Sequence, residues 1–295
     1  MQSRSTRLST MSEQLLNFAS VGSGMQLAPV SGPWLDFVCN VCGSLHSEPM
    51  ADFHREKALC AVCGSNARFR GMVAALGDVL QVPAGLALVD WPVLPDVRGL
   101  GMSDWPGYAD VLARKMAYVN THFEQAPQLD ILQPGQQWLG VHDFVLSTDV
   151  LEHVLPPVQK AFDHLLALLK PGGWLVFSVP YTTEPCTREH YPGVVGFEVV
   201  RACGQRVLLW QQADGALHLD AEPEFHGGAG ATLELRVFGR DAVLAHLAQA
   251  GFTQVRELNV PRLDCGYYWP PIYEPTPQSP PYLAYIIVAQ RPLTP

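Results

Sequence analysis

The chain has 295 residues, of which 48% are hydrophobic and 16% are charged, and its formal net charge is -9. This composition is typical of a globular protein with a substantial core, and the length allows one large domain or a medium domain plus a small module. The negative charge argues against nucleic acid as a partner, and no apolar run reaches the roughly 20 residues that a membrane span needs.

The first 30 residues contain several Arg and Ser residues and no long apolar segment, so we expect a mobile tail there. The chain has seven cysteines, an odd number, and four of them form two tight pairs. This pattern favours metal binding in a reducing compartment over a disulfide framework. We therefore expect a cytoplasmic protein.

Two C-x-x-C-G turns, at residues 39–43 and 60–64, can each wrap one side of a tetrahedral ion. The spacing predicts a closed structural zinc site, a zinc ribbon over residues 31–68, with four ligands: Cys39, Cys42, Cys60 and Cys63. Bound Zn²⁺ would supply folding energy that so short a segment lacks. The alternative is that the pairs are unmetallated or redox-active. We expect His46 and His54, between the pairs, at the surface.

An apolar pattern of helical spacing follows the second pair and ends before Pro83. Arg68 and Arg70 lie at its start. The pattern predicts a helix that leads from the zinc module into the main domain, residues 69–295. The two arginines are expected to pair with a carboxylate at the junction or to reach an anionic ligand.

Several short apolar runs then predict strands of a sheet. Residues 86–92 are the best candidate for a first strand and residues 97–104 for a second. Residues 141–147 and 174–180 are short apolar runs typical of buried parallel strands, and between them residues 158–169 have helical spacing. A turn is expected at residues 170–173. Strand, helix and strand in this order predict a right-handed crossover.

Two segments in this region carry a family resemblance. DFVLSTDVLEHV at residues 143–154 and LLKPGGWLVFSVPY at residues 168–181 resemble the fourth-strand and fifth-strand motifs of class I S-adenosylmethionine-dependent methyltransferases. The resemblance implies an α/β fold with a Rossmann-like, seven-stranded sheet, and S-adenosylmethionine as the cofactor. An insert then follows the fifth strand, at about residues 181–237.

The resemblance also implies a site beside the fourth strand, because ligands of parallel sheets bind at the carboxyl ends of strands. Asp149, Glu152 and His153 lie there, next to the expected methionine part of the cofactor and the acceptor. His153 is a candidate catalytic residue. For Glu152 and His153 the alternative is capping and packing of the next helix.

The cofactor ligands that the resemblance implies come from the earlier strands. Asp104, with Gly101 and Ser103 in the same turn, corresponds to the acid that binds the ribose hydroxyls after the second strand. Asp130 corresponds to the third-strand acid near the adenine amino group. The family's glycine-rich first turn has no counterpart after residues 86–92, where Asp90 is the candidate. Asp104 and Asp130 could instead be capping or turn residues.

The insert contains two histidine clusters, and long interruptions of this kind are usually functional. His190 follows Glu189, and His226 lies two residues after Glu224. Either histidine could remove a proton from an acceptor hydroxyl, with its neighbouring glutamate as an orienting group, and Glu189 is a candidate catalytic residue. The alternative is that the histidines only make structural hydrogen bonds.

Beyond the insert, a helix is expected at residues 241–250 and strands at 252–260 and 282–290, which resemble the last two strands of the methyltransferase sheet. The loop at residues 267–281 is rich in proline and aromatic residues. Its aromatic rings could stack on a sugar or an aromatic acceptor, or the loop could simply pack over the sheet.

Taken together, the zinc knuckles and the GMSDW, E-H-Y-P and F-H-G-G segments resemble a bacterial group of class I methyltransferases with an N-terminal four-cysteine zinc ribbon, some of them associated with glycosyltransferases. The resemblance covers roughly residues 35–290. It implies methyl transfer to an oxygen or nitrogen of a small molecule, with a saccharide as one candidate. Two alternatives are a non-catalytic binding protein of this fold and an RNA or protein methyltransferase that uses the zinc module for recognition.

Overall fold

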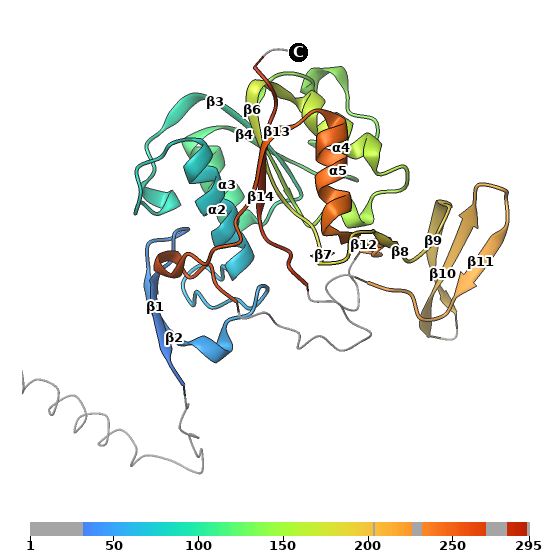
Figure 1. Ribbon diagram of the computed structural model, residues 1–295, viewed down its shortest axis with the longest axis horizontal. Helices are drawn as coiled ribbons and strands as arrows, with labels where there is room; N and C mark the ends of the chain where they lie inside the picture. The colour runs from blue at the N-terminus through green and yellow to red at the C-terminus, as the bar shows by residue number, and fades with distance from the viewer. Residues whose placement is uncertain (1–31, 203, 226–231, 270–281, 294–295) are drawn as a thin grey trace, which may run out of the picture. The chain divides into compact units, whose positions relative to one another are not determined.

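The computed structural model describes residues 32–202, 204–225, 232–269 and 282–293 (Figure 1). Its centre is a six-stranded sheet with the order β13-β14-β6-β5-β3-β4. Strands β4, β3, β5 and β6 are parallel, whereas β14 is antiparallel to both β6 and β13. The bounds are β3 (Leu94–Met102), β4 (Met116–Thr121), β5 (His142–Thr148), β6 (Leu169–Ser178), β13 (Thr253–Glu257) and β14 (Ile287–Gln290).

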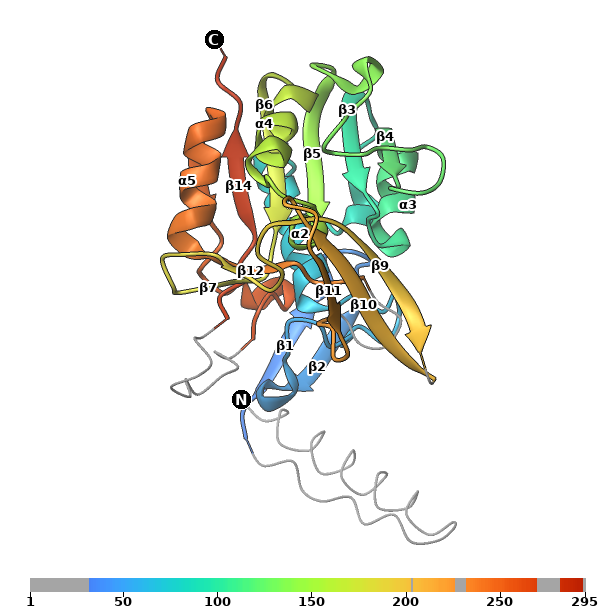
Figure 2. The same cartoon turned by 90° about the vertical axis from the view of Figure 1, so that its right-hand side faces the viewer.

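Helices cover both faces of this sheet, as Figures 1 and 2 show. On one face, α2 (Ala67–Val79) and α3 (Pro106–Lys115) pack in a core that includes Phe144 and Leu146 of β5. On the other face, α4 (Gln159–Leu168) and α5 (Arg240–Ala250) pack in a core that includes Val145. The alternation along β5 follows from the two-residue period of a strand, and both faces are apolar because both are covered.

The strand and helix predictions from residue 141 onward are largely confirmed. The strands expected at 141–147 and 174–180 are β5 and the second half of β6, and the expected helix is α4. One detail was wrong, since residues 170–173 lie inside β6 and not in a separate turn. Gly172 there adopts a φ of 80°, a conformation that glycine tolerates without a Cβ penalty.

The earlier strand predictions need correction. Residues 86–92 form no strand: they contain a short 3-10 helix, η3 (Leu88–Asp90), whose backbone hydrogen-bonds to Asn40 and Val41 of the first cysteine turn. Residues 129–131 are also not a strand, so the described sheet has six strands and not seven. The segment predicted as the second strand is β3, which lies between β4 and β5 and therefore takes the place of the first strand.

The four-cysteine segment packs into the same core as α2. Strands β1 (Trp34–Val38) and β2 (Leu45–Pro49) form an antiparallel hairpin, followed by a 3-10 turn, η2 (Met50–Asp52). Phe37 and Phe53 from this segment are buried in one cluster with Met72 of α2. Asn66 caps α2, because its side-chain oxygen accepts a hydrogen bond from the backbone nitrogen of Phe69 at 2.8 Å.

The inserted segment folds into two small sheets. The first is antiparallel with the order β11-β10-β9, and its strands are β9 (Val194–Ala202), β10 (Gln205–Gln212) and β11 (Leu217–Asp220). The second has the order β7-β12-β8, and its strands are β7 (Tyr181–Thr182), β8 (Arg188–Glu189) and β12 (Arg236–Gly239). The first sheet contributes to a separate core of Tyr191, Val194, Leu208, Leu233 and Leu235, whereas Tyr181 of β7 and Phe238 of β12 are buried in the core of α4 and α5. Figure 1 shows the β9–β11 sheet at the side of the molecule, beyond β12 and β8.

Among the described residues, none of the helices combines the length and apolar character that a membrane crossing requires.

Candidate functional site

The order of the strands reverses between β3 and β5, since the chain goes from β3 outward to β4 but from β5 in the opposite direction to β6. In open parallel sheets, ligands bind outside the carboxyl ends of the strands at such a point. Here β3 is followed by Ser103 and Asp104, and β5 ends at Thr148 and is followed by Asp149. This edge of the sheet is therefore the candidate active site.

Asp104 is buried at this point and is held by three hydroxyl groups. Tyr108 and Thr148 donate hydrogen bonds to its Oδ1 at 2.6 and 3.0 Å, and Tyr118 donates a short hydrogen bond to Oδ2. Burial raises the pKa of Asp104, although these hydroxyls partly offset the effect. Asp104 thus ties β3, α3, β4 and β5 together. The reason for assigning it to the ribose, a position after the second strand, no longer holds.

Gly101 is needed for this hydroxyl cluster. A Cβ atom at this position would lie 1.9 Å from the Tyr118 hydroxyl oxygen and 2.2 Å from Oδ2 of Asp104. Ser103, by contrast, is exposed and adopts a φ of 56° at the carboxyl end of β3. The turn after β3 therefore reaches a left-handed conformation without a glycine pair, and Ser103 is the residue of this turn that faces solvent.

Strand β4 lies at the edge of the sheet beside β3, the position expected for the second strand. The first acid after β4 is Glu124, an exposed residue that was not among the predicted site residues. Asp130 lies in the following turn, where its Oδ1 accepts a hydrogen bond from the backbone nitrogen of Leu132 at 2.8 Å. This turn runs beside the end of β4, since Leu129 donates a backbone hydrogen bond to His122. Asp90 lies elsewhere, in η3, which precedes β3 in the chain. Its Oδ2 is near Gly43 of the first cysteine turn.

Asp149, directly after β5, is buried in a network of charges. Arg55 binds both its carboxylate oxygens at 2.8 Å, and Ser178 donates to Oδ1 at 2.6 Å. Burial alone would raise the pKa of Asp149, but the charges of Arg55 and Arg68 outweigh it and hold the pKa well below its usual range. Of the two alternatives for Arg68, the structure supports a carboxylate partner. Arg70 contacts backbone oxygens of Ser65 and Gly266 instead.

Glu152 and His153 lie in the next turn, the 3-10 helix η5 (Leu151–His153). Glu152 is fully buried, and burial together with the negative charge of Asp149 raises its pKa well above the usual value. His153 contacts the backbone oxygen of Leu233 through Nδ1 at 2.7 Å, and its Nε2 lies 3.7 Å from Oε1 of Glu152. His153 therefore links η5 to the insert.

The insert brings His190 to Glu234, a residue that the sequence reasoning did not consider. Nε2 of His190 lies 3.0 Å from Oε1 of Glu234, and both side chains are mostly buried. The backbone of His190 donates to Leu235, whose own nitrogen donates to Glu152 at 2.8 Å. His190 is thus joined to the loop after β5 through two successive backbone hydrogen bonds.

The expectation that Glu189 orients His190 is wrong. Glu189 accepts a hydrogen bond from Nε of Arg236 at 2.8 Å. Arg236 is fully buried and also donates to the backbone oxygens of Leu151 and Val154, so the pair fastens the insert to η5. The other histidine candidate, His226, lies outside the described residues.

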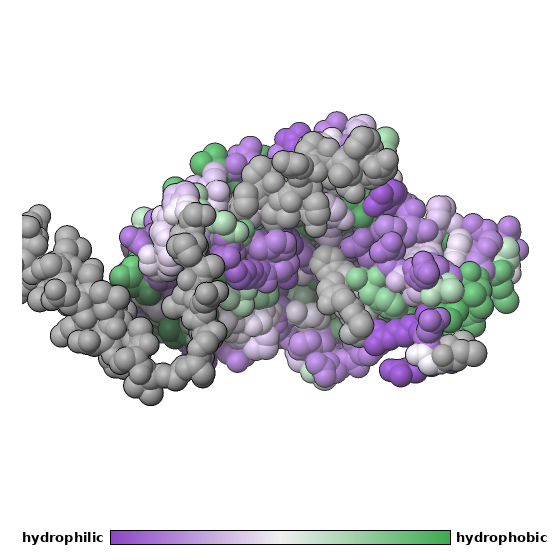
Figure 3. Space-filling view, turned by 90° about the horizontal axis from the view of Figure 1, so that it is seen from below, coloured by the Kyte–Doolittle hydropathy of each residue, from purple (hydrophilic) through white to green (hydrophobic). Residues whose placement is uncertain are grey.

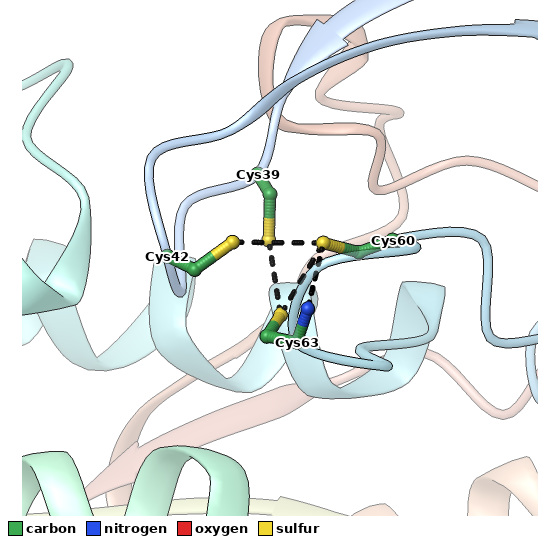
Figure 4. A group of neighbouring side chains, drawn as sticks. All are labelled: Cys39, Cys42, Cys60 and Cys63. Atoms are coloured by element: carbon green, nitrogen blue, oxygen red, sulfur yellow. Dashed lines mark hydrogen bonds between the residues drawn. The ribbon is translucent and has the colours of Figure 1, made fainter.

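The four cysteines predicted as ligands come together, with their sulfur atoms all within 4.8 Å of one another (Figure 4). The separations include 3.7 Å for Cys39 and Cys63 and 3.5 Å for Cys42 and Cys60. A tetrahedral ion with Zn–S bonds of about 2.3 Å would set sulfurs roughly 3.8 Å apart. The hydrogen bond between Cys39 and Cys63 lowers the pKa of Cys39 to about 4 and raises the pKa of Cys63 well above its usual value, so the pair shares one proton until a metal replaces it. The cluster can hold a metal ion.

His46 was expected at the surface, but it contacts the cysteine cluster through Ser44. Its Nε2 lies 2.7 Å from Oγ of Ser44, which in turn contacts Sγ of Cys42 at 3.0 Å. Its ring also stacks on Phe37, with 5.1 Å between the centroids. His46 is therefore an outer partner of the cluster and not simply a surface residue, because ligating sulfurs commonly receive such hydrogen bonds.

The aromatic loop contributes less than its composition suggested. Tyr267 is buried, donates from its hydroxyl to the backbone oxygen of Leu258 at 2.8 Å, and packs edge-on against Trp269. It is a core residue. The rest of the predicted loop, residues 270–281, lies outside the described residues.

Figure 3 views the molecule from below in the orientation of Figure 1, from the end of the sheet where β5 finishes. Hydrophilic residues are visible between the grey atoms, and apolar residues gather at the side of the β9–β11 sheet. Two leucines of this sheet are strongly exposed: Leu217 at 77% and Leu219 at 67%.

The raised pKa of Glu152 gives a testable pH dependence. Because the native carboxyl group binds its proton more tightly than the unfolded one, the stability it contributes is present below the unfolded pKa of 4.5 and is lost as the pH rises through the higher native pKa. Glu152→Gln does not ionise. We expect it to gain stability relative to wild type as the pH increases above 4.5, by at most about 1.4 kcal/mol per pH unit.

Denaturant unfolding of both proteins between pH 5 and pH 8 measures this difference. Glu198→Gln, an exposed position on β9, serves as the matched control and should parallel wild type. A stability difference between Glu152→Gln and wild type that stays constant across the range would contradict the expectation.

Comparison with known proteins agrees with the fold. Residues 109–255 match the sequence model of a methyltransferase-domain family. This segment includes β4, β5, β6 and the whole insert. The chain therefore has an α/β methyltransferase fold, and residues 109–255 are similar to that family. No curated protein matches the chain significantly.

Three solved structures are similar at low identity. The 1,6-didemethyltoxoflavin-N1-methyltransferase of Burkholderia thailandensis, with bound 1,6-didemethyltoxoflavin and S-adenosylhomocysteine, is 15% identical over 77% of this chain and 78% of its own, with a TM-score of 0.39. CalS10, an amino pentose methyltransferase of Micromonospora echinaspora, is 15% identical over 76% of this chain and 95% of its own, with a TM-score of 0.38. An S-adenosylmethionine-dependent methyltransferase of Clostridium acetobutylicum is 10% identical over 82% of this chain and 94% of its own, with a TM-score of 0.41. Similarities this low do not identify an acceptor for this chain.

Proposed function

We propose that this protein transfers a methyl group from S-adenosylmethionine to an oxygen or nitrogen of a small-molecule acceptor, with saccharides as the first class to test. The observation that carries the proposal is the cluster of polar groups at the point where the strand order reverses, within a methyltransferase fold. The net charge of -9 supports a neutral or cationic small acceptor over RNA. Reduced C-x-x-C pairs support a cytoplasmic location.

The residues at the strand ends fit such a cofactor in their chemistry. Exposed Ser103 borders the turn after β3, and Glu124 follows β4, where a carboxylate would bind the ribose hydroxyls. Asp130, beside the end of β4, would accept from the adenine amino group. Asp149 would face the methionine part only indirectly, because Arg55 occupies both its oxygens. Gly101 and Asp104 shape the turn from within.

The four cysteines fit Zn²⁺ as a structural ion. Their sulfur separations match tetrahedral coordination by four thiolates, which leaves no position for water. The ion would stabilise the segment and take no part in the reaction.

When bound, the cofactor supplies an electrophilic methyl group on its sulfonium sulfur. The chain's own task is to hold the acceptor atom in line with this methyl group and to take the proton that the acceptor loses. His190 is the best placed base: with Nε2–H donated to Glu234, its Nδ1 carries the lone pair that can accept the proton. The acceptor oxygen or nitrogen gains the methyl group, and its proton ends on Nδ1.

Calorimetric titration with S-adenosylhomocysteine tests the proposal. We expect wild type to bind, and Glu124→Ala to bind about 10 to 100 times more weakly, because a hydrogen bond to a charged group contributes about 1.5–3 kcal/mol. Asp110→Ala, which removes an exposed carboxylate of α3, is the matched control and should bind like wild type. Absence of binding by wild type would overturn the proposal and favour a non-catalytic protein with this fold.

A further inference from the structure

Arg55 connects the four-cysteine segment to the loop after β5. It lies between the two C-x-x-C pairs in sequence, yet its two terminal nitrogens each bind one oxygen of Asp149 at 2.8 Å. Its Nε donates to the backbone oxygen of Ala284 at 3.1 Å. The side chains of Arg55 and Asp149 are only 10% and 5% exposed. Such two-pronged binding of a carboxylate requires the planar fork of arginine, which lysine lacks.

A second pair of charges surrounds this contact. Glu56 accepts from Nη1 of Arg55 at 2.5 Å, from Nη2 of Arg68 at 2.8 Å and from the side chain of Asn66 at 3.0 Å. Nε of Arg68 also lies 3.4 Å from Oδ2 of Asp149. Two arginines and two carboxylates thus balance one another in a largely buried position. Arg68 belongs to the first turn of α2, five residues after Cys63.

Asp149 determines the course of the loop that follows. Its φ of 50° is a left-handed conformation, which residues other than glycine hold only where their surroundings impose it. Its backbone nitrogen donates to Ser178 at 3.0 Å, next to the side-chain contact with the same residue. Immediately after it, η5 presents Glu152 and His153 toward the insert.

We propose that the four-cysteine segment forms a wall of the methyl-transfer site, and that its Arg55 is a positioning residue that holds Asp149 in place. Metal binding at the cysteines and cofactor binding at the strand ends therefore favour each other. The inference rests on the proposed function. It gives the metal segment a role within the site, in place of recognition of a macromolecule, because its arginines already bind carboxylates of the chain itself.

The coupling follows from the positions of the arginines. Arg55 precedes Cys60 by five residues, and Asn66, which caps α2 and contacts Glu56, follows Cys63 by three. Loss of the metal would release both ends of this segment and with them the contact to Asp149. Since coupling between two binding sites is reciprocal, a ligand at the strand ends must raise the affinity for the metal by the same factor.

Two measurements on the zinc-loaded protein test this inference. The first is calorimetric titration with S-adenosylhomocysteine of wild type, Arg55→Ala, Arg55→Lys and the control Lys57→Ala, which removes an exposed ion pair with Asp52 in the same loop. The second is the zinc affinity of each protein, from competition with a chromogenic chelator, with and without S-adenosylhomocysteine.

We expect S-adenosylhomocysteine to raise the zinc affinity of wild type and Lys57→Ala by about fivefold or more. Arg55→Lys should bind S-adenosylhomocysteine at least about fivefold more weakly and show less coupling, and Arg55→Ala should show none. If Arg55→Ala fails to retain zinc, Arg55→Lys alone carries the test. The inference would be overturned, and the proposed function left intact, if both Arg55 variants bind S-adenosylhomocysteine with wild-type affinity. The same holds if S-adenosylhomocysteine does not change the zinc affinity of wild type. Failure of wild type to bind S-adenosylhomocysteine would overturn both.

Discussion

Replacement of Cys60 by serine is expected to abolish stable metal binding and to lower the melting temperature by roughly 10 °C or more. The buried side chains of Phe37 and Phe53 share one core with α2 and the sheet, so unfolding of the cysteine segment would expose part of the main core as well. Structural zinc sites contribute on the order of 10 kcal/mol of binding free energy, a large fraction of which a missing ligand removes. Chelation of the metal from wild type should produce the same decrease.

Metal analysis of the purified protein and thermal unfolding with and without a strong chelator measure these effects. Cys186→Ser is the matched control, because Cys186 is exposed and lies outside the cluster. It should keep one bound zinc ion per chain and the wild-type melting temperature. A wild-type protein without metal, or a Cys60→Ser variant as stable as wild type, would show that the cluster is not a structural metal site.

His190→Gln should reduce kcat by about 10² to 10⁴, the usual contribution of a general base, with little change in the affinity for S-adenosylhomocysteine. Glu234→Gln should reduce kcat less, because the histidine remains while its carboxylate partner is lost. A lower kcat at an unchanged affinity for S-adenosylhomocysteine distinguishes a role of Glu234 in orienting the base from a merely structural role.

The measurement uses S-adenosylmethionine with a labelled methyl group and a panel of amino and hydroxyl sugars, on the acceptor that wild type methylates. His218→Gln is the control within the insert, where His218 stacks on Trp210 at 4.3 Å between ring centroids. It should retain near wild-type kcat. If His190→Gln keeps wild-type kcat over the whole pH range, the proton is taken by another group or by water.

The part of the fold that could be predicted from the sequence is the part whose signal is local. The stretch from β5 through α4 to β6 combines apolar strands of period two with a helix of 3.6-residue period, and its order determines a parallel crossover. The C-x-x-C-G turns are equally local, since each pair needs only the geometry of its own turn. These predictions were close to the observed bounds.

The assignment of the earlier strands could not be made in this way. Which strand lies beside β5 depends on pairing across the sheet, and neither the register nor the neighbour of a strand is written in its own apolar pattern. Residues 86–92 were therefore counted as the first strand, and residues 97–104, which form β3, were moved to the second place. The ribose assignment of Asp104 followed from that shift, and Glu124 was overlooked.

The sequence by itself determined the four-cysteine cluster, the central crossover and the position of Asp149 after a buried strand, because each depends on residues close together in the chain. Only the tertiary structure decided which charged groups meet. Glu234 lies 44 residues from His190 and Arg55 lies 94 residues from Asp149, and adjacent acids such as Glu189 were the wrong partners. A buried charge must be paired, but its partner is chosen by the packing that brings distant segments together.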